Sequence, residues 1–194
     1  MKSPQRDELW FRWKDVGIKT FCRVGSGTIS REITGAQGYK LFMDAPVKVC
    51  VVRHPWDRLK SVWFGMFPGG TMPSRGYPAC KTIEQLIAHI LNTPDWELDP
   101  HCQSMYGQLA DYWLPEDSEL MTLDAFMAEP PFGLPKPATH WHKSPSYREP
   151  EVDEMLKTRF FLRYANDLAL FRRAEKSPLV TGGKLGDVDG HEEE

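Results

Sequence analysis

The apolar residues of this chain alternate in one stretch, run together in a second, and then recur with helical spacing. In residues 17–24, one set of alternate positions holds Ile18, Thr20, Cys22 and Val24 and the other holds Lys19, Phe21 and Arg23, a pattern that predicts a strand. Residues 47–52 are mostly apolar and β-branched, which is typical of a parallel strand covered on both faces. A Gly-Ser-Gly turn and a helical stretch that begins at residue 28 lie between them. This order predicts a βαβ unit with one crossover helix and a right-handed crossover.

Further helices are predicted downstream. Pro55 suits the first turn of a helix, and apolar residues then recur on one helical face. Residues 82–85, Thr-Ile-Glu-Gln, form a capping-box pattern before a helix that continues to residue 92. Residues 119–123 resemble a short strand, and residues 149–173 indicate two helices. Together these elements predict an α/β protein with a short parallel sheet flanked by helices.

The length and charge of the chain favour one domain and a tail. The 194 residues are enough for a single domain with its own core. We expect this domain to span residues 1–176 and an acidic, disordered tail to span residues 177–194. The tail has one Lys against two Asp and three Glu, a balance of −4, so the net charge of −3 leaves the rest near +1. A domain so close to neutral disfavours nucleic-acid binding, which needs a basic face.

Neither a membrane span nor a metal site is indicated. No apolar run reaches the roughly 20 residues of a spanning helix, and no apolar core follows the charged first residues. We therefore expect a soluble, cytoplasmic protein. The four cysteines include no Cys-x-x-Cys pair and lack the ligand spacing of a zinc site, so we expect no metal. In an exported protein these cysteines could instead pair as disulfides.

The strongest chemical signal is an Arg-x-Pro-x-x-Arg-x-x-Ser pattern at the junction of the second strand and its following helix. Arg53 ends the strand at the carboxyl edge of the sheet, where open α/β folds bind ligands. Arg58 and Ser61 are three residues apart and share one helical face. Two guanidinium groups and a hydroxyl in this arrangement predict an anion site. Alternatively, Arg58 pairs with a carboxylate such as Asp57 and Ser61 is only exposed.

This segment, Val-Arg-His-Pro-Trp-Asp-Arg-Leu-Lys-Ser-Val-Trp, closely resembles the 3′-phosphate motif of sulfotransferases. These enzymes use 3′-phosphoadenosine-5′-phosphosulfate (PAPS), and the resemblance is to the carbohydrate type and its bacterial and phage relatives. It implies a P-loop-like sulfotransferase fold and PAPS as co-substrate. It also implies that Arg53 and Ser61 hold the 3′-phosphate of the nucleotide, with Arg58 beside them.

Two weaker resemblances flank this motif. Residues 21–30, Phe-Cys-Arg-Val-Gly-Ser-Gly-Thr-Ile-Ser, look like the family's 5′-phosphosulfate loop. Residues 164–171, Tyr-Ala-Asn-Asp-Leu-Ala-Leu-Phe, resemble its closing helix, a match that mostly reflects packing. The loop resemblance implies that the cofactor's 5′ side is held by six consecutive residues: Gly25, Ser26, Gly27, Thr28, Ile29 and Ser30.

One departure from the family pattern concerns catalysis. The family's loop lysine aligns with Gly25, so the usual cation on the transferred group is missing. Arg23 lies two residues before that position, and Lys19 shares its strand face. Either side chain could replace the lysine, and Arg23 is the one we assign to catalysis. Without a replacement, the leaving phosphate would lack its electrophilic partner.

Histidine is the natural base for an acceptor proton near neutral pH. His101, in Asp-Pro-His-Cys-Gln, resembles a histidine that follows the 3′ motif in many carbohydrate sulfotransferases, and it is our first candidate. A helix-capping or core-edge histidine is the alternative. Glu32 is a second candidate base or an ordinary surface carboxylate. His140 and His142, in a Pro-rich segment, are expected to contact the acceptor or the nucleotide.

The resemblance thus implies transfer of a sulfuryl group from PAPS to an acceptor hydroxyl on a carbohydrate or similar small molecule. One alternative is a non-catalytic PAP or nucleotide binder on the same fold, which the missing loop lysine favours. A nucleotide kinase-like phosphotransferase is another, although the chain has no Gly-x-x-x-x-Gly-Lys-Ser/Thr run. A structural or interaction protein would bind no such ligand. The acceptor and the oligomeric state stay open.

Overall fold

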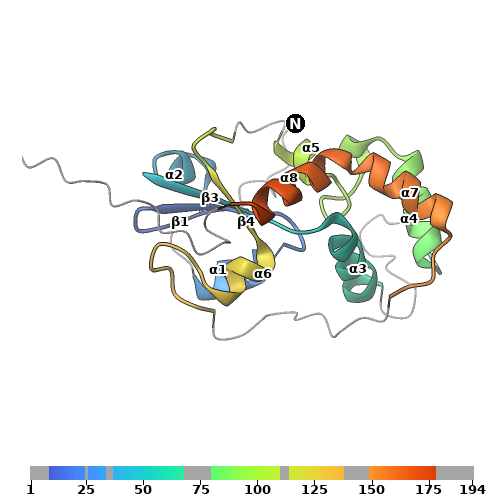
Figure 1. Cartoon of the computed structure of the whole chain (residues 1–194), viewed down its shortest axis with the longest axis horizontal. Helices are drawn as coiled ribbons and strands as arrows, with labels where there is room; N and C mark the ends of the chain where they lie inside the picture. Colours follow the sequence, from blue (N-terminus) through green and yellow to red (C-terminus); the bar gives the residue numbers. More distant parts are fainter. Residues whose placement is uncertain are drawn as a thin grey trace, which may run out of the picture.

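A four-stranded sheet forms the centre of one α/β domain (Figure 1). The computed structural model describes residues 9–24, 26–33, 37–67, 80–109, 114–137 and 149–177. The strands are β1 (Trp10–Trp13), β2 (Val16–Lys19), β3 (Val47–Val52) and β4 (Glu119–Thr122), and they lie side by side in that order. The pairs β2–β3 and β3–β4 are parallel, whereas β1–β2 is an antiparallel hairpin. The sheet is therefore mixed and mostly parallel, and β1 is the strand that the sequence pattern did not predict.

Strand β2 is shorter than its alternating pattern suggested. It ends at Lys19, and residues 20–24 turn back on themselves instead of extending the strand. The Thr20 hydroxyl donates to the Val24 carbonyl, and the Val24 N–H donates to the Phe21 carbonyl at 3.0 Å. Arg23 adopts a left-handed backbone conformation with a φ of 63°. A tight turn thus replaces the last residues of the predicted strand.

Eight α-helices and a short 3₁₀ helix, η3, lie within the described residues. Two short helices, α1 and α2, connect β2 to β3, so the expectation of one crossover helix was wrong. The helix after Pro55, the capped helix from residue 83 and the two helices near residues 149–173 are confirmed. The helices are α1 (Ser26–Glu32), α2 (Tyr39–Met43), α3 (Pro55–Met66), α4 (Ile83–Asn92), η3 (Asp95–Glu97), α5 (Met105–Leu109), α6 (Leu123–Ala128), α7 (Glu154–Arg163) and α8 (Ala165–Glu175).

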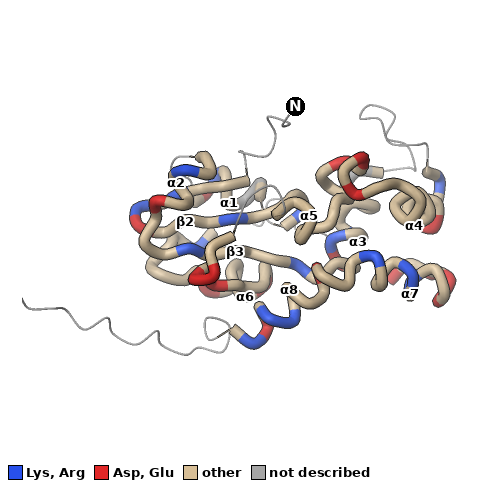
Figure 2. The backbone as a smooth tube through the Cα atoms, turned by 90° about the horizontal axis from the view of Figure 1, so that it is seen from above, with Lys and Arg blue, Asp and Glu red and all other residues tan. Residues whose placement is uncertain are grey.

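Two apolar clusters hold the domain together. The first surrounds the sheet, where β2, β3 and β4 pack against α1, α6 and α8. The second joins α3, α4 and α7 and includes Leu59, Ile90 and Phe160. Figures 1 and 2 both place α3 between the sheet and the α4–α7 pair. The loops at the carboxyl ends of β2 and β3 therefore meet α3 at the boundary between the two clusters.

Ser177 is the last described residue of the chain, and the boundary between domain and tail expected after residue 176 stays a prediction. Ser177, the first residue of the expected tail, is 7% exposed, and its N–H donates to the Ala174 carbonyl at 3.1 Å. Residues 178–194 lie outside the described residues. Within the described part of the chain, no helix combines the length and apolar character that crossing a membrane requires.

Candidate functional site

Arg58 on α3 binds the main chain of two separate loops. Its Nε donates to the Cys22 carbonyl at 3.0 Å, Nη1 to the Gln103 carbonyl at 2.6 Å, and Nη2 to the Pro100 carbonyl at 3.0 Å. The side chain is only 3% exposed. Three of its five N–H donors are therefore used in joining the turn after β2 to the segment that carries His101.

Arg53 makes a second contact with the same turn. It directly follows β3, and its Nη1 donates to the Arg23 carbonyl at 3.1 Å. Because β2 and β3 are parallel neighbours, the residues that follow both strands meet at one edge of the sheet. The two sequence motifs, 30 residues apart at these positions, are thus brought into direct contact.

Ser61 lies on the face of α3 that meets this turn. It is 6% exposed and stands between Arg58, three residues before it, and Gly65, four residues after it. A Cβ added at Gly65 would come within 2.8 Å of the Arg23 Nη1 atom. The absence of a side chain at Gly65 therefore lets the Arg23 guanidinium lie against the same helix face.

The predicted 5′ loop is described only in part. Gly25 lies outside the described residues, and α1 begins at Ser26. Gly27 and Thr28 belong to α1, but their side chains are outside the description. Ile29 is fully buried in the sheet cluster, so its side chain packs in the core, whereas the side chains of Ser26 and Ser30 are half-buried.

The two cations proposed to replace the missing loop lysine have different surroundings. Lys19 is 2% exposed, and its ammonium lies 4.3 Å from the Trp10 ring centroid and 4.7 Å from that of Phe21. These contacts are cation–π interactions that hold Lys19 between aromatic rings. Arg23 is only partly buried and lies beside α3. Lys19 is therefore enclosed by aromatic rings, whereas Arg23, the residue that the sequence analysis assigns to catalysis, lies along α3.

His101 is held by a neighbouring carboxylate. The Asp99 Oδ1 atom lies 2.5 Å from His101 Nδ1 and also accepts from the His101 backbone N–H at 2.9 Å. Each of the two side chains is 21% exposed. Among the described residues, His101 Nε2 has no hydrogen-bond partner.

A buried polar network fixes the segment around His101. Tyr164 donates its hydroxyl to the Cys102 carbonyl, and Gln108 donates to the Pro100 carbonyl at 2.9 Å. Asp167 accepts from the backbone N–H groups of Met105 and Tyr106, both at 2.8 Å. The sequence does not predict this network as a unit, although residues 164–171 resemble the closing helix of sulfotransferases.

The positive charge of Arg58 favours the ionised form of Asp167 in this network. Burial raises the pKa of Asp167, and the positive charge of Arg58 together with the two backbone hydrogen bonds acts in the opposite direction. Burial also raises the pKa of Tyr164 well above its usual value. A buried cation, a buried carboxyl and an un-ionised phenol thus share one region next to the His101 segment.

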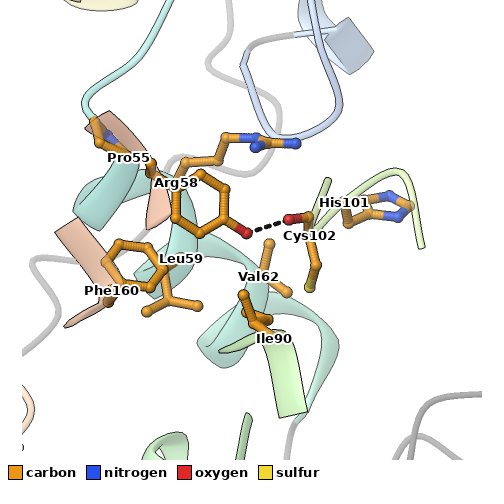
Figure 3. Close-up of a pocket in the computed structure, with 9 residues that line it drawn as sticks. Pro55, Arg58, Leu59, Val62, Ile90, His101, Cys102 and Phe160 are labelled. Carbon is orange, nitrogen blue, oxygen red and sulfur yellow. Dashed lines mark hydrogen bonds between the residues drawn. The ribbon is translucent and has the colours of Figure 1, made fainter. Parts of the chain in front are cut away.

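A small cavity lies beneath these residues (Figure 3). Its volume of about 10 Å³ is close to the smallest space that holds one water molecule. Apolar side chains that include Leu59, Ile90 and Phe160 form one side of it. Figure 3 shows the Arg58 guanidinium and the His101 ring directed away from these apolar side chains. A nucleotide could not enter this cavity, so any ligand would have to approach the outward-facing polar groups.

His54, between Arg53 and α3, is packed among aromatic rings. Its ring centroid lies 5.2 Å from that of Phe171 and 5.9 Å from that of Phe161. Burial lowers the pKa of His54, while Asp57 acts in the opposite direction. The last residue of the 164–171 segment therefore supports the strand–helix junction of the 3′ motif.

His140 and His142 lie outside the described residues. Glu149, the first described residue after them, accepts from Trp56 Nε1 at 2.5 Å and from Lys60 at 3.1 Å, both on α3.

Within the described ranges, no group of three His, Cys, Asp or Glu side chains could hold a metal ion.

Comparisons with protein-family models, with curated proteins and with solved structures give no match to this chain. The resemblance to sulfotransferases therefore stays a prediction from the motifs.

Replacing Arg58 should destabilise the whole domain. Arg58→Ala removes the guanidinium donor from the carbonyls of Cys22, Pro100 and Gln103. It also removes the positive charge that stabilises the ionised form of Asp167. We expect the free energy of unfolding in urea to fall by roughly 3 kcal/mol. The exposed Arg159→Ala on α7 serves as the matched control and should change it by less than about 0.5 kcal/mol. Equal stability of the two variants would contradict the structural role of Arg58.

The burial of His54 should make the domain less stable in mild acid. Its pKa is lowered in the folded state, so below the unfolded-state value of 6.5 the unfolded chain binds the proton more readily. The free energy of unfolding should therefore decrease as the pH falls from about 6.5 towards about 5. His54→Phe, which can pack among the same rings, should reduce this decrease without abolishing it, because burial also lowers the pKa of His89. Urea unfolding of both proteins over this range measures the difference, and identical pH slopes would refute the assignment.

Proposed function

We propose that this protein is a sulfotransferase that moves a sulfuryl group from PAPS to an acceptor hydroxyl. The observation that carries the proposal is the contact between the two motifs: Arg53 and Arg58 bind the carbonyls of Arg23 and Cys22. Arg58 also binds the segment that presents His101. The resemblance assigns one segment to each end of the cofactor and a third segment to the base. The guanidinium of Arg58 joins these three segments. The P-loop-like sulfotransferase fold is part of this proposal.

Arg53 and Ser61 are the proposed ligands of the 3′-phosphate. Arg53 is half-buried at the carboxyl edge of the sheet, and Ser61 lies on the adjoining face of α3. Arg58 has two N–H donors that no described residue uses, but its three carbonyl contacts give it a mainly positioning role. Ser26 to Ser30, after Gly25, would hold the 5′ side of the cofactor.

Arg23 is the proposed cation on the transferred group. Its left-handed backbone and the space beside Gly65 place its guanidinium along α3, whereas Lys19 is enclosed by two rings. A guanidinium near the bridging oxygen would stabilise the charge that develops on the leaving phosphate.

His101 is the proposed general base. In the reaction the acceptor oxygen forms a bond to sulfur, the bond from sulfur to the phosphate oxygen of PAPS breaks, and His101 Nε2 takes the acceptor proton. The products are a sulfate ester and PAP, and no metal or covalent intermediate is needed. The resemblance alone suggests a sugar or similar small molecule as the acceptor.

Binding of PAP tests the nucleotide site. A ligand that binds the folded state raises the melting temperature by mass action, so PAP should raise that of the wild type. Arg53→Ala should abolish most of the increase, because the 3′-phosphate loses a charged donor. The control Arg159→Ala should retain it. An equal increase in Arg53→Ala and the wild type would remove Arg53 from the site.

A second candidate function is binding of PAP or a related nucleotide without catalysis. The enclosure of Lys19 by two aromatic rings favours this function. Only Arg23 then remains to replace the loop lysine of the family pattern.

Transfer of labelled sulfate from PAPS to a panel of sugar hydroxyls distinguishes the two functions. If the protein is an enzyme, His101→Ala should lower kcat by about 10²- to 10⁴-fold and leave the PAP-induced increase in melting temperature intact. If the wild type binds PAP but transfers no sulfate, the second function is the correct one.

A further inference from the structure

Asp99 makes two contacts with His101 through a single oxygen. Oδ1 accepts the backbone N–H at 2.9 Å and lies 2.5 Å from Nδ1 of the ring. A carboxylate oxygen is an acceptor, so the nitrogen that faces it must carry a proton. We propose that Asp99 is the positioning residue of this site: it keeps the proton of neutral His101 on Nδ1 and leaves Nε2 as the proton acceptor. Its catalytic consequence rests on the proposed sulfotransferase function.

The backbone around this pair is held from several sides. Arg58 and Gln108 bind the Pro100 carbonyl, and Tyr164 binds the Cys102 carbonyl. The Asp99 carbonyl accepts from the N–H groups of Cys102 and Gln103 at 2.8 and 3.0 Å. The bond to Asp99 therefore restricts a ring whose backbone is already fixed on both sides.

The remaining ring nitrogen is available for chemistry. His101 Nε2 has no hydrogen-bond partner among the described residues, and the ring points away from the apolar side chains that line the cavity (Figure 3). When Nε2 accepts a proton, the ring becomes a cation, and the carboxylate of Asp99 stabilises that charge. In an exposed ion pair, water would screen the two charges and the carboxylate would stabilise the imidazolium only weakly. Here both side chains are only 21% exposed.

Nitrogen-15 NMR of histidine-labelled protein tests the tautomer without any substrate. Spectra would be recorded at about pH 8, above the usual range of imidazole titration. The signals of His101 are assigned by their loss in His101→Gln. We expect the wild type to show Nδ1 protonated and Nε2 unprotonated. Asp99→Ala should show a mixture of tautomers, while Glu97→Ala, which removes an exposed acid of the same segment, should match the wild type.

Two NMR results would overturn the proposal: a proton on Nε2 in the wild type, or an unchanged tautomer in Asp99→Ala. Melting temperatures of the variants show whether each one is folded, and Asp99→Glu, which restores a carboxylate, provides a second variant if the alanine protein is unfolded. In Asp99→Glu, recovery of the Nδ1 proton supports the proposal and a tautomer mixture like that expected of the alanine variant counts against it.

Sulfate transfer from PAPS separates this inference from the proposed function. Asp99→Ala should lower kcat by about 10²-fold or more and leave the PAP-induced increase in melting temperature unchanged. Full activity with an altered tautomer would refute the positioning role and leave the sulfotransferase function standing. If NMR shows the predicted tautomers but the wild type transfers no sulfate, the positioning of His101 by Asp99 is supported and the sulfotransferase function is rejected.

Discussion

The three bonds from the Arg58 guanidinium to main-chain carbonyls are the interaction on which the rest of the site depends. They join Cys22, after β2, to Pro100 and Gln103, on either side of His101. A planar group with five donors can reach two loops at once, which an ammonium cannot do with the same geometry. Removing a nearly fully buried cation from this position would leave two loops without their shared partner.

This constraint explains why polar residues gather in an otherwise apolar region. Burying a guanidinium is costly unless its donors are satisfied and its charge is balanced. Three carbonyls bind three of the five donors of Arg58, and Asp167 contributes to the balance of charge. Asp167 in turn accepts the first N–H groups of α5, and Tyr164 binds the Cys102 carbonyl. The α7–α8 end of the chain is therefore part of the frame that orients His101.

Local patterns were sufficient to predict several of the regular elements, although not β1. The apolar run of β3, the proline at the start of α3 and the capping residue Thr82 each carry a signal within a few residues, and each is confirmed. The short length of β2 was not predicted, because the turn at residues 20–24 depends on the bond from Thr20 to Val24 and on contacts with arginines far along the chain. The second crossover helix, α2, was also missed.

The role of Arg58 lies beyond what a single sequence can show. An arginine that binds phosphate and one that binds carbonyls have the same residue type and the same spacing from Ser61. The distinction arises from residues 36 and 45 positions away. In contrast, Arg53 and His101 carry local signals, and their assignments to nucleotide and base stay predictions.

A crystal structure of the protein with PAP bound would test the central claim most directly. We predict that the 3′-phosphate lies within hydrogen-bond distance of Arg53 and Ser61, while Arg58 keeps its bonds to Cys22, Pro100 and Gln103. A nucleotide bound elsewhere on the molecule, or Arg58 released from these carbonyls to bind the phosphate itself, would contradict it.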